Sequence, residues 1–86
     1  MRFDRTTRFK RAYQALPVHL QIKVDKTLRL LAVNLRHPSL QVKKMKGRDD
    51  LYEARVDLRY RLTFLMEHDV FILRVVGDHD DVLKNP

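Results

Sequence analysis

The sequence predicts an α+β fold: a short N-terminal strand, a helical hairpin, and then an antiparallel sheet of three or more strands with the helices on one face. Apolar residues recur at helical spacing through the first half and alternate with a period of two from Leu40 onward. The joints between these segments are short, and strands joined this closely pair antiparallel. We therefore expect one domain, 1–86, with the second face of its sheet partly bare.

The first segments are a short strand and a helix. Met1–Asp4 is the predicted strand, and Thr6 and Thr7 are candidate N-caps for the helix that follows. That helix carries one apolar face, made of Phe9, Ala12, Tyr13 and Leu16.

Pro17 ends this helix and suits the first position of the next one. The second helix, Pro17–Arg36, repeats apolar residues at Leu20, Val24, Leu28, Leu31 and Leu35. The pair His37-Pro38 stops it, because the residue before a proline avoids helical geometry.

The second half predicts strands. A turn at Gly47–Asp50 leads into Leu51–Asp57, whose alternation places Tyr52, Ala54 and Val56 on one face. Tyr60–Glu67 alternates more clearly, and Val70–Val76 is apolar on both faces, as suits an interior strand. Gly77 should end that last strand and leave Asp78–Pro86 as a polar tail.

Composition limits the partners and the chemistry that this protein can have. The net charge of +7 favours encounters with polyanions, although an acidic protein partner or simple solubility explains it equally well. The chain has no cysteine, which excludes disulfides, thiolate chemistry and cysteine-based zinc sites. The N-terminus is charged and no apolar run approaches the roughly 18 residues of a membrane span, so we expect a cytoplasmic protein without a membrane partner.

Charged residues gather on the predicted outer face of the hairpin. Glu53 and Arg55 share one side of their strand, and Arg61 and Thr63 join them from the next strand. Arginine binds phosphate oxygens in a bidentate manner, so this face suits a phosphate ligand. A solvated face with cross-strand ion pairs is the alternative.

The run LQVKKMKGRDDLYEARVDLRYRLTF, with the later VVGDHDDVLK, resembles the C-terminal half of RelE/ParE superfamily toxins from type II toxin–antitoxin systems. The matching features are a lysine-rich strand, a glycine turn, Tyr52-x-x-Arg55, Tyr60-Arg61 and Val76-Gly77-x-His79. They cover about Leu40–Lys84, half of the chain, and the first half agrees in the order of its elements.

The resemblance implies a toxin with a cognate antitoxin protein as partner. RelE-like members are metal-independent endoribonucleases that cut messenger RNA on the ribosome, with the RNA 2′-hydroxyl as nucleophile. ParE-like members instead inhibit DNA gyrase, and an orphan relative that binds RNA or protein without cutting is a further alternative. Neither a cofactor nor a small-molecule ligand is implied.

Carried over to this sequence, the resemblance implies that Arg61 holds the scissile phosphate, that Arg55 is a second basic group, and that His79 is an acid or base. Two positions depart from the pattern. Glu53 stands where some members have a basic residue, and Leu83 stands about where active members have a tyrosine.

A basic stretch precedes the hairpin. It consists of Lys43, Lys44, Lys46 and Arg48. Such a stretch is suited to binding ribosomal RNA, and a solvated lysine strand edge explains it equally well.

Overall fold

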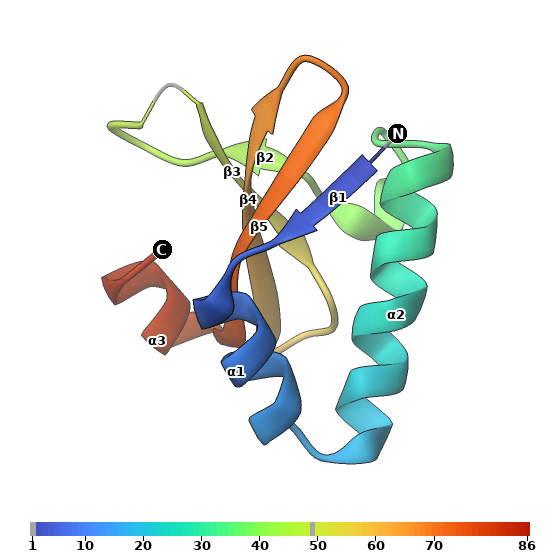
Figure 1. Cartoon of the computed structure of the whole chain (residues 1–86), viewed down its shortest axis with the longest axis vertical. Helices are drawn as coiled ribbons and strands as arrows, with labels where there is room; N and C mark the ends of the chain where they lie inside the picture. The colour runs from blue at the N-terminus through green and yellow to red at the C-terminus, as the bar shows by residue number, and fades with distance from the viewer. Residues whose placement is uncertain (1, 49) are drawn as a thin grey trace.

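The computed structural model describes residues 2–48 and 50–86. Met1, in the predicted first strand, and Asp49, in the predicted turn, lie outside the described residues. Along the chain (Figure 1) the elements are β1 (Arg2–Arg5), α1 (Thr7–Ala15), α2 (Val18–Val33), the 3₁₀ helix η1 (Pro38–Leu40), β2 (Lys43–Lys44), β3 (Leu51–Arg55), β4 (Tyr60–Glu67), β5 (Val70–Asp78) and α3 (His79–Lys84).

The strands form one five-stranded sheet in the order β1-β5-β4-β3-β2. All neighbours pair antiparallel except β1 and β5, which are parallel. The helical hairpin supplies the long crossover that lets β1 enter at the far edge of the sheet. The predicted α+β class and order of elements are confirmed.

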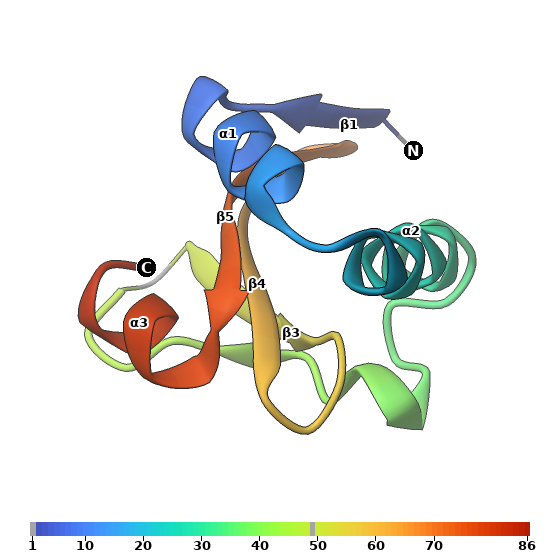
Figure 2. The ribbon, with the colours of Figure 1, turned by 90° about the horizontal axis from the view of Figure 1, so that it is seen from below.

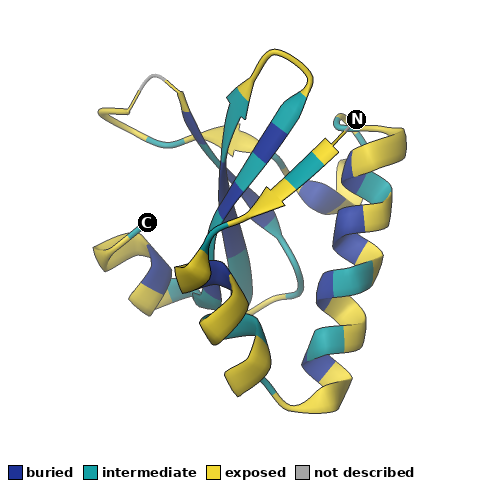
Figure 3. Cartoon of the chain, in the orientation of Figure 1, coloured by how far each residue is buried: buried dark blue, intermediate teal, exposed yellow. Residues whose placement is uncertain are grey.

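The core lies between one face of the sheet and the helices α1 and α2. Buried residues follow the inner sides of these helices and the strands beneath them (Figure 3). The cluster consists of Phe9, Val24, Leu28, Leu31, Leu40, Ala54, Leu62, Phe64, Phe71, Leu73 and Val76. We call the opposite side of the sheet the outer face. Helix α3 lies on that side, across the sheet from α2 (Figure 2).

The predicted start of α1 is confirmed, and the start of α2 is shifted by one residue. Thr6 is the N-cap of α1, because its hydroxyl accepts a 3.1 Å hydrogen bond from the Phe9 N–H. Pro17 is the N-cap of α2 rather than its first residue. The end predicted at Arg36 was wrong: α2 stops at Val33, where Asn34 turns to extended geometry.

The C-terminal prediction was wrong. Strand β5 continues through Gly77 to Asp78, and the expected polar tail folds into α3. The Asp78 carboxylate caps this helix by accepting a 3.0 Å hydrogen bond from the Asp80 N–H. Asp80 and Asp81 in its first turn and Lys84 in its last turn complement the helix dipole.

The predicted strand Leu51–Asp57 ends at Arg55, while β4 has the predicted bounds. Val56 and Asp57 instead begin the β3–β4 turn, where both N–H groups donate to the main-chain oxygen of Tyr60. This turn closes the end of the sheet at which the candidate site lies.

Candidate functional site

Strand register places two arginines side by side on the outer face. Arg55 on β3 is the cross-strand partner of Arg61 on β4, and Arg61 in turn faces Gly77 on β5. The flanking residues Ala54 and Leu62 are buried in the core, so this row points to the opposite face. Both arginines are half-buried. The predicted pairing of Arg55 with Arg61 on one face is therefore present.

Arg61 is held against the β3–β4 turn by its own guanidinium. Its Nη1 donates a hydrogen bond of 2.6 Å to the main-chain oxygen of Asp57. The same nitrogen also reaches the main-chain oxygens of Leu58, at 3.3 Å, and Tyr60, at 3.1 Å. Within residues 2–48 and 50–86, no hydrogen bond involves its Nε or Nη2. Those two groups are the part of the fork that a phosphate would meet.

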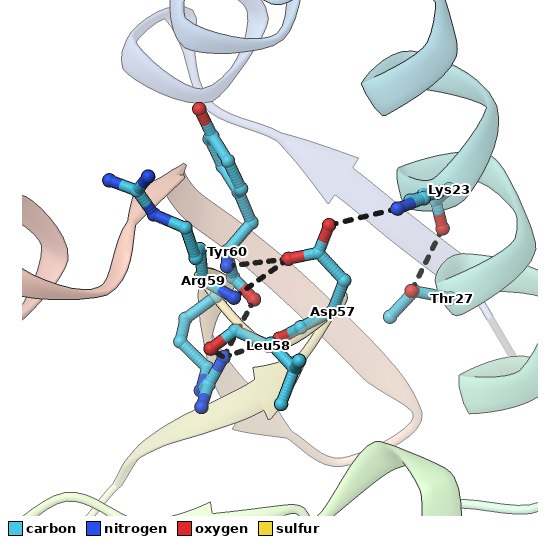
Figure 4. A network of polar contacts seen from close by, with 7 residues as sticks. Lys23, Thr27, Asp57, Leu58, Arg59 and Tyr60 are labelled. Carbon is cyan, nitrogen blue, oxygen red and sulfur yellow. Dashed lines mark hydrogen bonds and ion pairs between the residues drawn. The ribbon is translucent and has the colours of Figure 1, made fainter.

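The turn itself is organised by Asp57 (Figure 4). Its Oδ1 accepts from the N–H groups of Arg59, at 2.9 Å, and Tyr60, at 2.8 Å. Its Oδ2 pairs at 3.1 Å with the ammonium of Lys23 on α2. Burial alone would raise the pKa of Asp57, but the two N–H groups and Lys23 outweigh it and hold that pKa below its ordinary value.

His79, the first residue of α3, is tied to the same turn. Its N–H donates a 2.6 Å hydrogen bond to the main-chain oxygen of Arg59. The Arg59 guanidinium in turn pairs at 3.0 Å with Asp78. The Asp80 N–H, followed by Arg59, lowers the pKa of Asp78. The His79 side chain is 39% exposed, with Nδ1 3.6 Å from the Asp80 carboxylate.

The three predicted catalytic residues thus surround one turn, at one end of the sheet. Strand pairing brings Arg55 and Arg61 together. The hydrogen bond from the His79 N–H to the main-chain oxygen of Arg59 holds the start of α3 against the same turn. Phosphodiester cleavage needs a cation that binds the phosphate and a group that transfers a proton, and arginine and histidine are residue types that can supply them.

The chain matches no protein-family model and no curated protein. Solved structures do match. YafQ from E. coli strain BL21(DE3) superposes with a TM-score of 0.78 at 14% identity, over 95% of this chain and 98% of YafQ. The YoeB/ParE toxin from Agrobacterium tumefaciens gives 0.78 at 13% identity, over 92% and 99%. The RelB–RelE antitoxin–toxin complex from Methanococcus jannaschii gives 0.72 at 20% identity, over 96% of this chain and 99% of the matched chain.

The chain has the RelE/ParE toxin fold. The predicted resemblance rested on the second half, whereas the structural likeness spans more than nine-tenths of the chain and so includes β1 and the helical hairpin. At these identities the likeness establishes the fold, and the chemistry must be argued from the residues present.

Within this RelE/ParE-like fold, Glu53 lies on the outer face by register, as expected. It is 2% exposed, however, rather than solvated beside Arg55. Its Oε1 pairs at 3.3 Å with Lys43, and its buried Oε2 has no hydrogen-bond partner among the described residues. Its cross-strand partner Thr63 is also buried, beneath the main-chain oxygen of Pro86.

The expected bare face is therefore covered at its centre. Gly77 lies in the row of Arg61, and a Cβ built on it would lie 3.6 Å from the side chain of Val82. Helix α3 thus packs on the outer face through Val82, which is 2% exposed. Leu83, the second position at which the sequence departs from the predicted toxin pattern, is 47% exposed on the same helix.

The basic stretch follows the edge of the sheet at β2 and the loop after it. Its four residues, Lys43, Lys44, Lys46 and Arg48, are all exposed. Two of them also have structural roles. Lys43 neutralises Glu53, and the Lys44 ammonium lies 6.0 Å from the centre of the Tyr52 ring. Lys46 and Arg48 are the pair on which an RNA role for this edge depends most.

Our sequence reasoning missed the supporting residues Asp57, Arg59 and Asp78. The sequence offered one signal for Asp57: it is an aspartate at the end of a predicted strand, where its side chain can accept a hydrogen bond from the N–H two residues later. Two acidic residues, Asp80 and Asp81, stand two and three positions after Asp78, which is typical of a helix start.

The described residues contain no group of three or more His, Asp or Glu side chains placed to hold a metal ion. None of the helices over residues 2–48 and 50–86 has the length and apolar character of a membrane span.

Proposed function

We propose that this protein is the toxin of a type II toxin–antitoxin pair, and that it is a metal-independent endoribonuclease that cuts messenger RNA on the ribosome. The observation that carries the proposal is the row of Arg55 and Arg61 beside the turn that also anchors His79. The RelE/ParE fold supports the same function, since solved structures with this fold are toxins and toxin–antitoxin complexes.

Each residue has a distinct role in this proposal. Nε and Nη2 of Arg61 bind the scissile phosphate, and Arg55 shares the negative charge that develops when the 2′-hydroxyl attacks. Anchoring of Nη1 by the turn fixes the plane of the guanidinium before RNA binds, which favours preorganised charge stabilisation. His79 transfers the proton, either from the nucleophile or to the leaving 5′-oxygen.

The antitoxin is the proposed protein partner, and the cytoplasm the proposed site of action. A partner that binds only the folded toxin stabilises it, by about 2.7 kcal/mol at a hundredfold excess over Kd. Co-expression with the product of the neighbouring open reading frame should therefore give a complex with a higher melting temperature. Purification of this protein alone, with no binding to that product, would contradict the pairing.

A second candidate is a non-catalytic relative, either a gyrase inhibitor or a binder of RNA or protein. Two observations favour it. Glu53 puts a buried carboxylate where some relatives have a basic residue, and Leu83 puts an exposed apolar side chain where active relatives have a tyrosine.

The two candidates differ in the product that they leave. Purified protein is added to ribosomes programmed with a defined message. Attack by the 2′-hydroxyl should leave 2′,3′-cyclic phosphate ends, and Arg61→Ala should leave none. An uncut message together with stalled DNA supercoiling would instead support the gyrase inhibitor.

A further inference from the structure

Three side chains from three different elements converge on the main-chain oxygens of residues 85 and 86. The Thr63 hydroxyl, on β4, donates to the Pro86 oxygen at 3.1 Å. The Arg74 guanidinium, on β5, donates to the same oxygen at 3.3 Å. Arg8 on α1 donates to the oxygen of Asn85. Two guanidinium groups and a hydroxyl are thus aimed at adjacent oxygens.

Arg74 is set in place by the backbone. The register of β4 and β5 passes from Thr63 opposite Val75 to Phe64 opposite Leu73, so Arg74 is the extra residue of a β-bulge. The main-chain oxygen of Arg74 accepts a 3.1 Å hydrogen bond from the Thr6 hydroxyl at the start of α1. That bond joins the bulge to the helix that carries Arg8.

No acidic side chain of the described residues pairs with this cluster. Neither Arg8 nor Arg74 forms an ion pair with an Asp or Glu side chain there, whereas the nearby Glu53 is matched by Lys43. The oxygens of residues 85 and 86 are met one guanidinium at a time, whereas a phosphate offers several oxygens in the geometry that the guanidinium fork binds.

The position of the cluster indicates which anion. It lies on the outer face, since Thr63 is two residues from Arg61 on the same strand. Beside it is a shallow pocket lined by Thr6, Arg8, Leu65, Ile72 and Arg74. This pocket combines the apolar side chains Leu65 and Ile72 with two arginines, which suits the face of a nucleobase next to its phosphate.

We propose that Arg8, Thr63 and Arg74 form a second phosphate site, which binds the RNA backbone away from the cleaved bond, and that residues 85 and 86 occupy it until RNA displaces them. The inference rests on the proposed function, because it extends the RNA path from Arg61 along the outer face. An acidic protein segment would meet the same guanidinium groups, but it would not use a pocket for a base.

The first test measures RNA binding without cleavage. The probe is a 2′-O-methyl RNA octanucleotide, which lacks the nucleophile, titrated over a range of salt concentrations. Arg8→Gln and Arg74→Gln should each weaken binding about tenfold and reduce the salt slope by about 0.7, the value for one lost phosphate contact on a single strand. Arg11→Gln removes the same charge from the exposed side of α1 and should change Kd less than about twofold.

Arg74→Lys is a second variant, which keeps the test independent of whether Arg74→Gln folds. It keeps the charge but not the planar fork, so the salt slope should stay while affinity falls. If Arg8→Gln and the Arg74 variants behave like Arg11→Gln, the site is disproved.

The second test follows residue 85. The chain has no cysteine, so Asn85→Cys gives a single position for an environment-sensitive dye. The substitution keeps the contact, because Arg8 binds the main-chain oxygen. Saturating octanucleotide should change the dye signal, and Arg74→Gln should change it before RNA is added.

A dye that does not respond to bound RNA would overturn the proposal. So would arginine-dependent binding of polyglutamate in preference to RNA, since that result would assign the cluster to an acidic protein. Octanucleotide binding that depends on Arg8 and Arg74 in a protein that never cuts RNA would leave this site standing and reject only the proposed cleavage.

Discussion

The guanidinium of Arg61 donates a 2.6 Å hydrogen bond to the main-chain oxygen of Asp57, which lies four residues earlier in the β3–β4 turn. Arg61 also faces Arg55 across the two strands that this turn joins. The arginine proposed to hold the phosphate therefore also holds the turn beside it. Binding geometry and local stability depend on the same side chain.

Arg61→Ala should lower both activity and stability. Loss of one charge-stabilising contact costs about a hundredfold in rate, and loss of the carbonyl contacts costs about 1 kcal/mol of unfolding free energy. Arg29→Ala, on the exposed side of α2, is the matched control and should change neither by more than about 0.5 kcal/mol. A folded Arg61→Ala protein that cuts RNA at the original rate would remove Arg61 from the site.

Asp57→Asn should destabilise the protein in a pH-dependent way. Because the folded pKa is lowered, ionised Asp57 adds stability above its unfolded pKa of about 3.9, and this is lost as pH falls through the folded value. Urea unfolding should show a deficit of about 1–2 kcal/mol at pH 7 that shrinks below about pH 4. Asp69→Asn, exposed in the β4–β5 turn, should show no such dependence, and an equal deficit at every pH would argue against the assignment.

The ion pair between the buried Glu53 and the exposed Lys43 should respond asymmetrically to mutation. Lys43 is 69% exposed and can return to water, whereas the Glu53 side chain is 3% exposed and cannot. Lys43→Gln should therefore cost about 1–3 kcal/mol by leaving a buried charge unpaired, while Glu53→Gln should stay within about 1 kcal/mol of the parent. Thermal melts of the two variants decide the point, and equal losses would show that the pair acts only through packing.

His79→Gln should remove a limb of the pH–rate profile within about pH 5.5–8, where histidines ordinarily change charge. The fold should survive, because the contact with Arg59 uses the main-chain N–H of His79. His19→Gln, exposed on α2, is the control that keeps the limb. Cleavage by His79→Gln at the parent rate across this range would leave Arg55 and Arg61 to carry the chemistry.

Local signals predicted much of this fold, because they depend on neighbouring residues alone. The alternation of Tyr60–Glu67 gave the bounds of β4, and Thr6 gave the cap of α1. Helix α3 was missed because six residues are too short for a helical period to stand out. Period two also placed Glu53 on the correct face, but it carries no information about what covers that face.

The predicted catalytic residues Arg55, Arg61 and His79 meet at one turn because of strand register and the position of α3. The spacing of residues along the chain predicts neither the exact strand register nor the position of α3. The cluster of Arg8, Thr63 and Arg74 was out of reach for the same reason, since it joins α1, β4 and the β5 bulge.

The central claim is cleavage of messenger RNA during translation. Its most direct test is primer extension on one message in cells that express the protein from an inducible promoter, compared with the same message lacking a start codon. New 5′ ends should appear within the coding region of the translated message only, and they should be absent with Arg61→Ala. Identical end patterns before and after induction, in cells whose growth the protein arrests, would contradict the account.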